Sequence, residues 1–226
     1  MSRLRWLLLL LVLSAPALPP VRAAWRFNRA AVQTLAVLVG ESGEAATAYA
    51  ALAAADSGDC RAAWYRGFLD QAAGQNDPAN NAWAAAIRCD RAFIPLLRAR
   101  LPDSRAWAAY AVEAQPQAAA GWFWLAEFYT VEQPGRAIEL LRTGLALDPT
   151  DGRAWNALGD LLAQSDPEAA IEAYLQACFN GDPGWNGCWK AGQTAERLGD
   201  YARAVEYYRY SRWPVARQRA ELLEGR

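Results

Sequence analysis

Three stretches in the C-terminal part of the chain repeat the same pattern of small and apolar residues. Their alanines, Ala137, Ala170 and Ala204, follow one another at spacings of 33 and 34 residues. In each stretch an apolar residue follows the alanine directly. A period of this length is typical of stacked helical hairpins, because a single hairpin cannot bury its apolar face alone. The repeat therefore restricts this part of the chain to an array of such hairpins.

Each of these stretches is preceded by another helical pattern with a small residue at a fixed place. The small residues are Ala126, Gly159 and Gly192. A side chain larger than methyl at this place would force two packed helices apart. In the helix that follows, a large apolar residue lies four positions after the repeated alanine; these residues are Leu141, Tyr174 and Tyr208.

The combined pattern resembles the tetratricopeptide repeat family over residues 118–213. The matching features are a tryptophan near the start of the first helix (Trp122, Trp155), a Leu-Ala or Leu-Gly pair, the alanine of the second helix and a closing Asp-Pro. There are two departures. The first two repeats are one residue short between their helices, with a proline at the turn, and Cys188 takes the place of the tryptophan in the third. The resemblance implies pairs of antiparallel helices.

A weaker helical rhythm continues upstream, where three more pairs are expected, the first of them split near Gly40 to Gly43. We therefore expect an all-α fold, a tetratricopeptide-like solenoid of about six antiparallel helix pairs plus a C-terminal capping helix. The expected organisation is a signal peptide or N-terminal membrane anchor at residues 1–23, divergent helical-pair repeats at 24–117, three repeats at 118–213 and the cap at 214–226.

The N-terminal segment has two arginines, Arg3 and Arg5, before an apolar run from Trp6 to Leu13. It is either a signal peptide cleaved after Ala23 or a retained membrane anchor. Because the arginines precede the apolar run and stay on the inner side, both interpretations export the rest of the chain. We expect an extracytoplasmic protein that is secreted, periplasmic or anchored in the membrane.

The four cysteines fit this compartment, since disulfides form in oxidising surroundings. Cys60 begins the first helix of one pair and Cys89 ends its antiparallel partner, while Cys178 ends one helix and Cys188 opens the next. This placement predicts the disulfides Cys60–Cys89 and Cys178–Cys188. The alternative is four buried free thiols.

Composition excludes several classes of function. The chain has no histidine, which removes the commonest general base and the commonest metal ligand. Its net charge of −1 gives no basic field for nucleic acid. No phosphate-binding loop, dinucleotide motif or calcium loop occurs in the sequence. We expect no enzymatic activity, no cofactor, no metal site and no nucleic-acid partner.

The resemblance implies that the first helices line a concave groove, whose ligand is an extended peptide or a partner's helix. The helix register then predicts eleven groove residues: Phe123, Trp124, Glu127, Asn156, Asp160, Gln164, Trp189, Lys190, Gln193, Glu196 and Arg197. Trp124 and Trp189 are equally compatible with positions in the core. Aromatic side chains beside hydrogen-bonding amides and carboxylates suit peptide recognition.

The predicted function is a non-catalytic protein–protein interaction scaffold on the extracytoplasmic side that binds a segment of a protein partner in this groove. One alternative is a membrane-anchored accessory subunit of a larger membrane protein complex. A further alternative, less favoured, is a glycan-binding accessory protein that uses exposed tryptophans.

Overall fold

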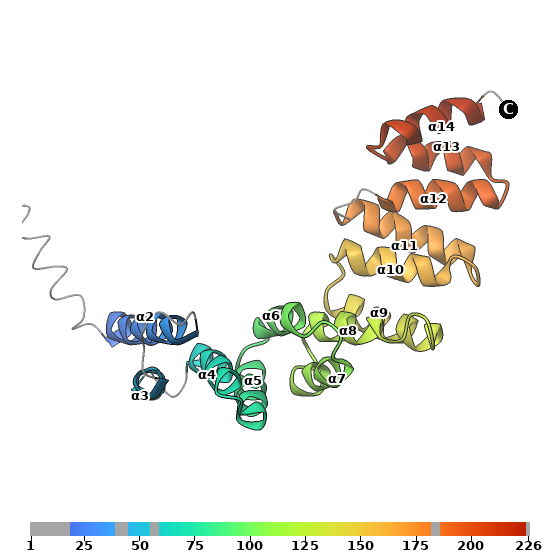
Figure 1. Cartoon of the computed structure of the whole chain (residues 1–226). Coiled ribbons are helices and arrows are strands. Elements are labelled where there is room, and N and C mark those ends of the chain that lie inside the picture. The colour runs from blue at the N-terminus through green and yellow to red at the C-terminus, as the bar shows by residue number, and fades with distance from the viewer. Residues whose placement is uncertain (1–18, 39–44, 55–58, 182–185, 225–226) are drawn as a thin grey trace, which may run out of the picture. The chain divides into compact units, whose positions relative to one another are not determined.

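The computed structural model is all-helical over the residues it describes, which are 19–38, 45–54, 59–181 and 186–224 (Figure 1). The chain divides into two compact units, residues 1–97 and 98–226. The helices are α2 (Pro19–Leu38), α3 (Ala45–Ala54), α4 (Cys60–Ala72), α5 (Asn76–Cys89), α6 (Phe93–Arg100), α7 (Arg105–Ala114), α8 (Ala119–Glu127), α9 (Pro134–Leu147), α10 (Gly152–Leu162), α11 (Pro167–Phe179), α12 (Asn186–Arg197), α13 (Tyr201–Tyr210) and α14 (Pro214–Glu224). These thirteen helices in the described part confirm the predicted fold class of six pairs and a cap.

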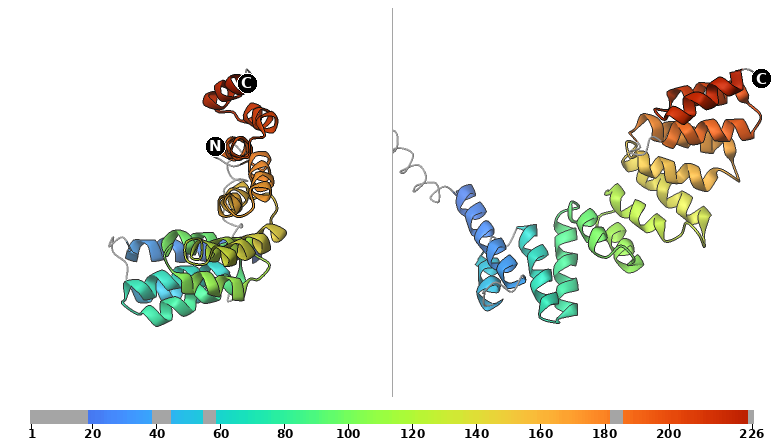
Figure 2. Two further views of the ribbon diagram at one scale, coloured as in Figure 1. Left: turned by 90° about the vertical axis from the view of Figure 1, so that its right-hand side faces the viewer. Right: turned by 45° about the horizontal axis from the view of Figure 1, so that its top comes forward.

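In the second unit, α10 to α14 lie side by side in chain order (Figures 1 and 2). Short polar side chains begin several of these helices. The carboxylates of Asp151, Asp166 and Asp200 accept hydrogen bonds from backbone N–H groups three residues on, at 2.9, 3.1 and 3.0 Å. Pro134 and Pro167 occupy the first positions of α9 and α11, where no intrahelical N–H bond is lost. The shortened turn of the first repeat is therefore closed by Pro134, and that of the second by Asp166 and Pro167.

Glycine and a large aromatic ring interlock the two helices of a hairpin. A Cβ atom at Gly159 would lie 2.5 Å from the ring of Tyr174, and one at Gly192 would lie 2.5 Å from the ring of Tyr208. The first repeat has alanine and leucine at the same two places, Ala126 and Leu141, and both are buried. The two repeats with glycine at the first place thus have tyrosine at the second, whereas the repeat with alanine has the smaller leucine.

The same device holds the α4–α5 hairpin of the first unit. A Cβ atom at Gly67 would lie 2.2 Å from the Nε1 atom of Trp83, whose side chain is buried. Ala79, in the place of the repeated alanine, is also buried. The α4–α5 pair is therefore built like the three C-terminal repeats, although its sequence has diverged.

In two repeats, a tryptophan hydrogen-bonds the start of the first helix to the preceding loop. The indole N–H groups of Trp122 and Trp155 donate to the carbonyl oxygens of Pro116 and Pro149, each at 2.8 Å. In the third repeat a disulfide takes over this task, because Cys188 stands at the tryptophan position and bonds to Cys178 at the end of α11. The cysteine that replaces the tryptophan of the repeat pattern thus makes a covalent link where the other repeats have a hydrogen bond.

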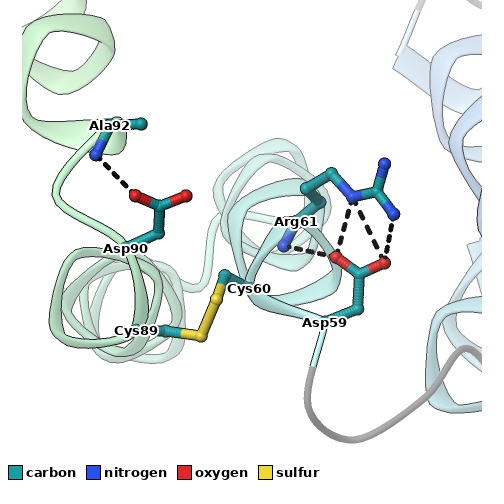
Figure 3. Close-up of a disulfide and its surroundings, with 6 residues drawn as sticks. All are labelled: Asp59, Cys60, Arg61, Cys89, Asp90 and Ala92. Carbon is teal, nitrogen blue, oxygen red and sulfur yellow. Dashed lines mark hydrogen bonds and ion pairs between the residues drawn. A yellow bond between two sulfur atoms is a disulfide. The ribbon is translucent and has the colours of Figure 1, made fainter.

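The second predicted disulfide joins Cys60 at the start of α4 to Cys89 at the end of α5 (Figure 3). Next to it, the Asp59 carboxylate caps α4 by accepting from the backbone N–H of Arg61 at 3.0 Å. The guanidinium of Arg61 also hydrogen-bonds this carboxylate and lowers the pKa of Asp59. Both predicted disulfides are present in the structure, and the alternative of four free thiols is wrong for it.

The predicted signal or anchor lies mostly outside the described residues. Helix α2 begins at Pro19 and continues through Ala23, the predicted cleavage position. The predicted break near Gly40 also lies outside the described residues. Within the described ranges, no helix is both long enough and apolar enough to cross a bilayer.

Candidate functional site

The candidate site lies in the second unit, on the face formed by the first helices of the repeats, between α10 and α12. Asp160 of α10 forms an ion pair with Lys190 of α12, with the Nζ atom 2.7 and 2.8 Å from the two carboxylate oxygens. The Asp160 side chain is 53% exposed and the Lys190 side chain 28%. This pair therefore stands at the surface and joins the first helices of two successive repeats.

Tyr174 of α11 contacts both members of this ion pair. Its hydroxyl donates to the Asp160 carboxylate at 2.7 Å, and its ring lies under the Lys190 ammonium, 5.5 Å from the ring centre. Burial of the side chain, followed by the hydrogen bond to Asp160, raises the pKa of the Tyr174 hydroxyl above its ordinary value. The hydroxyl therefore stays protonated at neutral pH and fixes the carboxylate in place.

A pocket of about 390 Å³ opens beside this pair. Its polar wall is provided by two exposed side chains of α12, Gln193 and Arg197. One guanidinium nitrogen of Arg197 donates to the carbonyl oxygen of Ala163 at 3.1 Å, which ties the side chain to α10. The pocket thus presents an amide, a guanidinium, an ammonium and a carboxylate within one small space.

A similar arrangement follows one repeat further along the chain. The Tyr208 hydroxyl donates to the carboxylate of Glu196 at 2.9 Å, and Arg219 of α14 forms an ion pair with the same carboxylate. Burial and this hydrogen bond raise the pKa of Tyr208, while the carboxylate raises the pKa of Arg219. Upstream, Glu127 of α8 pairs with Arg98 of α6. Acidic residues on first helices are therefore repeatedly matched by a cation from a neighbouring helix.

The predicted aromatic contacts lie deeper than expected. Trp124 is 0% exposed, and its indole N–H donates to the carbonyl oxygen of Pro102 at 3.2 Å. Its predicted role as a groove residue is therefore wrong, because the Trp124 side chain points into the core. Phe123 is half-buried and packs its ring over Gly144 of α9.

Trp189 is half-buried within an aromatic cluster. Its ring centre lies 5.0 Å from that of Tyr208 and 6.0 Å from that of Trp213. Of the other predicted residues, Asn156 is half-buried and Gln164 is exposed. The structure thus brings four of the eleven predicted residues together around one pocket, namely Asp160, Lys190, Gln193 and Arg197.

A larger pocket in the first unit was not predicted from the sequence. It has a volume of about 580 Å³, and its lining, mostly from α3, α4 and α5, includes five alanines. At its wall the Tyr49 hydroxyl donates to the buried carboxylate of Asp70 at 2.6 Å, and burial raises the Tyr49 pKa to about 12. The available signal was the small residue Gly67, which marks α4 as the first helix of a repeat.

Among the described residues, no group of three or more cysteine, aspartate or glutamate side chains is placed to hold a metal ion. The acidic groups of the site are instead occupied by tyrosine hydroxyls and by cations.

Comparison with known proteins gives one family match. The model of the tetratricopeptide repeat matches residues 186–209, which cover α12 and most of α13. No curated protein matches the chain.

Solved structures of similar fold include a chain of the APC/C hetero-tetramer Cut9–Hcn1, with a TM-score of 0.51 and 15% identity over 96% of this chain and 45% of that one. PilF of Pseudomonas aeruginosa has a TM-score of 0.49 and 16% identity over 81% of this chain and 88% of that one. YrrB, described as a TPR protein with an unusual peptide-binding site, has a TM-score of 0.48 and 14% identity over 72% of this chain and 89% of that one. At these identities the likeness concerns the fold alone.

Proposed function

We propose that this chain, a tetratricopeptide repeat protein, is a non-catalytic scaffold that binds an extended segment of a protein partner at the pocket between α10 and α12. The observation that carries the proposal is the surface pair of Asp160 and Lys190, held by Tyr174 beside an open pocket. Charged groups fixed in this way lose little side-chain freedom when a ligand binds, so their contacts contribute to affinity more fully.

The chemistry of the pocket favours a polar peptide. An extended backbone presents alternating N–H and C=O groups, and the Gln193 amide can both donate to and accept from such a backbone. Lys190 and Arg197 add two cations, against the single carboxylate of Asp160. A partner segment with amide or acidic side chains therefore complements the pocket better than a basic or apolar one.

The proposed location is extracytoplasmic. The two disulfides support it, since such bonds persist in oxidising compartments and are rare in the cytosol. The N-terminal sequence, with two arginines before an apolar run, supports export of the remaining chain. Membership of a membrane complex stays an alternative within this proposal, because a retained N-terminal segment would place the scaffold at the membrane surface.

The test is quantitative co-purification from the native cell with the full chain carrying Asp160→Asn and Lys190→Gln together. These changes remove both charges but keep side chains of similar shape, so the helices are expected to stay intact. The matched control removes two exposed charges elsewhere in the same unit, Glu139→Gln and Arg153→Gln. We expect the site variant to retain the partner at least about fivefold less well, because two charge-assisted contacts are lost. Equal retention by both variants would contradict the proposal.

A further inference from the structure

The pocket of the first unit contains a buried carboxylate at a place where the three C-terminal repeats have uncharged side chains. Gly67 of α4 and Gly159 of α10 each pack against an aromatic ring, so the two helices can be aligned on these glycines. Asp70 follows Gly67 by three residues and is 3% exposed. The residues at the same place in the C-terminal repeats are buried as well, and they are Tyr129, Leu162 and Ala195. In α4 a carboxylate therefore replaces a core side chain.

Two further replacements in α4 accompany this carboxylate. Arg66 stands directly before Gly67, and its side chain is 63% exposed. At that place the C-terminal repeats bury Leu125, Leu158 and Ala191. The small side chain of Ala63 stands where these repeats have Trp122, Trp155 and Cys188. Helix α4 thus has a polar pair and a small residue where the other first helices contribute to the core.

These replacements line the pocket of about 580 Å³, called the Asp70 pocket below. It lies between α3 and α5, and α4 provides its floor with Ala62, Ala63, Arg66 and Asp70. The second unit has a pocket of about 530 Å³ in the equivalent place, between α9 and α11. Its floor on α10 consists of three apolar side chains, those of Trp155, Leu158 and Leu162. The charge on the floor is therefore a property of the Asp70 pocket and does not follow from the repeat architecture.

The Asp70 carboxylate has one oxygen that is open to a ligand. Its Oδ1 atom accepts the hydrogen bond from the Tyr49 hydroxyl, at 2.6 Å. Its Oδ2 atom faces the Nε atom of Arg66 at 3.9 Å, which is beyond hydrogen-bond distance. The second carboxylate of the pocket, Asp59, is already held by hydrogen bonds from Arg61 (Figure 3). Because a buried ion is costly without hydrogen-bonded partners, a cation that donates to Oδ2 gains more here than at an open surface.

We propose that the Asp70 pocket binds a lysine side chain of a partner protein, with the ammonium at the Oδ2 atom of Asp70. The alkyl stem of lysine suits the small apolar side chains of the wall, which are those of Ala62, Ala63, Ala82 and Ala85. A guanidinium fits less well, since its bidentate pairing needs both carboxylate oxygens and Tyr49 already occupies Oδ1.

Two features favour a protein segment over a free amine. The volume of the pocket is that of sites for drug-sized ligands, which leaves room for backbone beside one side chain. The exposed amide of Asn81 on α5 lines the same pocket and can both donate to and accept from such a backbone. The inference does not rest on the pocket between α10 and α12, which belongs to the other unit and suits amide or acidic segments.

The direct test is a nuclear magnetic resonance titration of the full chain with the capped tripeptide alanine-lysine-alanine. The matched probe is alanine-norleucine-alanine, whose side chain has the same four-carbon stem without the ammonium. We expect the lysine peptide to bind about tenfold tighter or more, because a charge-assisted hydrogen bond is added. The shifts should appear at the amides of Ala62 and Ala85. Absence of binding, equal affinities, or shifts confined to the second unit would overturn the inference.

Replacement of Asp70 tests the charge on the floor of the pocket. Asp70→Asn keeps the shape of the side chain and an acceptor for Tyr49, and it should weaken binding of the lysine peptide about tenfold. Binding of the norleucine peptide should not change. The matched control, Asp103→Asn, removes an exposed carboxylate of the second unit and should have no effect. Undiminished binding of the lysine peptide to Asp70→Asn would show that Asp70 is not its partner.

Replacement of Arg66 has the opposite expected effect. Arg66→Gln removes the cation that competes for Oδ2, so the lysine peptide should bind about threefold tighter or more. The side chain is exposed, so the helix is expected to stay intact. Arg91→Gln, which removes another exposed arginine of the first unit, is the control and should leave the affinity unchanged. If Arg66→Gln binds the lysine peptide no better than the unchanged chain does, Oδ2 is not the binding atom.

The source of the lysine group is tested with n-butylammonium, which carries the lysine side chain without its backbone. We expect it to bind more weakly than the lysine peptide. Asn81→Ala should lower the affinity for the peptide roughly threefold and leave that for n-butylammonium unchanged, because only the peptide offers a backbone to the amide. Equal affinities of the peptide and n-butylammonium would mean that the pocket takes small amines, and a protein partner would then be excluded.

Discussion

Replacement of Gly159 by alanine tests whether the glycine–tyrosine contact holds the second repeat together. The added Cβ atom would lie 2.5 Å from two ring carbons of Tyr174, well inside van der Waals contact. Overpacking of this kind costs about 1 to 3 kcal/mol. Alanine in a helix interior recovers up to about 1 kcal/mol relative to glycine. We therefore expect the free energy of unfolding to fall by about 1 to 2 kcal/mol.

The assay is thermal unfolding of the full chain followed by circular dichroism, with Gly135→Ala as the control. A Cβ atom at Gly135 would meet nothing within 4 Å, so this change should be neutral or slightly stabilising. A loss of about 1 to 2 kcal/mol corresponds to a fall in Tm of roughly 2 to 8 °C for a chain of this size. Gly159→Ala should therefore lower Tm, whereas Gly135→Ala should leave it unchanged or raise it slightly.

A double variant makes this prediction specific. The first repeat has Ala126 and Leu141 where the second has Gly159 and Tyr174. Gly159→Ala combined with Tyr174→Leu copies that pair, so the second change should cost less in the Gly159→Ala background than alone. If Gly159→Ala behaves like Gly135→Ala, or if the two changes are strictly additive, the reasoning about this contact is wrong.

Three further predictions concern stability. Cys178→Ser with Cys188→Ser opens a loop whose ends are 10 residues apart, and chemical denaturation should show a loss of about 3 kcal/mol. Trp124→Ala should lower the free energy of unfolding by about 3 to 5 kcal/mol in the same assay, because a fully buried ring leaves a cavity. Arg203 donates two hydrogen bonds of 2.8 Å to Glu168 and lowers the pKa of that carboxyl below its ordinary value. This pair stabilises the fold above the ordinary pKa of glutamate, and its contribution is lost as the pH falls through the lowered value. Tm should therefore fall less on acidification in Arg203→Gln than in the unchanged chain.

The helix pairs and the disulfides could be predicted because they depend on local spacing. Alanines that recur at spacings of 33 and 34 residues determine where the helices pack, and prolines at the turns determine where helices begin. Once two helices are known to be antiparallel, the ends that carry Cys60 and Cys89 must be neighbours. No contact between distant parts of the chain is needed for either conclusion.

The site was predicted less well, because it depends on the exact rotation of each helix. Trp124 and Glu127 follow the same register in sequence, yet the first is fully buried and the second is exposed. Tyr174 was expected only as an apolar residue of the repeat. Its hydroxyl nevertheless donates a hydrogen bond to the exposed carboxylate of Asp160. Sequence spacing identifies which face a helix buries, but it does not show which polar atoms at the edge of that face meet.

The most direct measurement for the scaffold proposal is site-specific photo-crosslinking of the full chain in its native cell. One crosslinker replaces Gln193, which lines the pocket on α12, and another replaces the exposed Gln176 on α11. We predict that position 193 captures one defined segment of one protein and that position 176 does not capture that segment. Capture of the same proteins from both positions, or no capture from position 193, would contradict binding at this pocket.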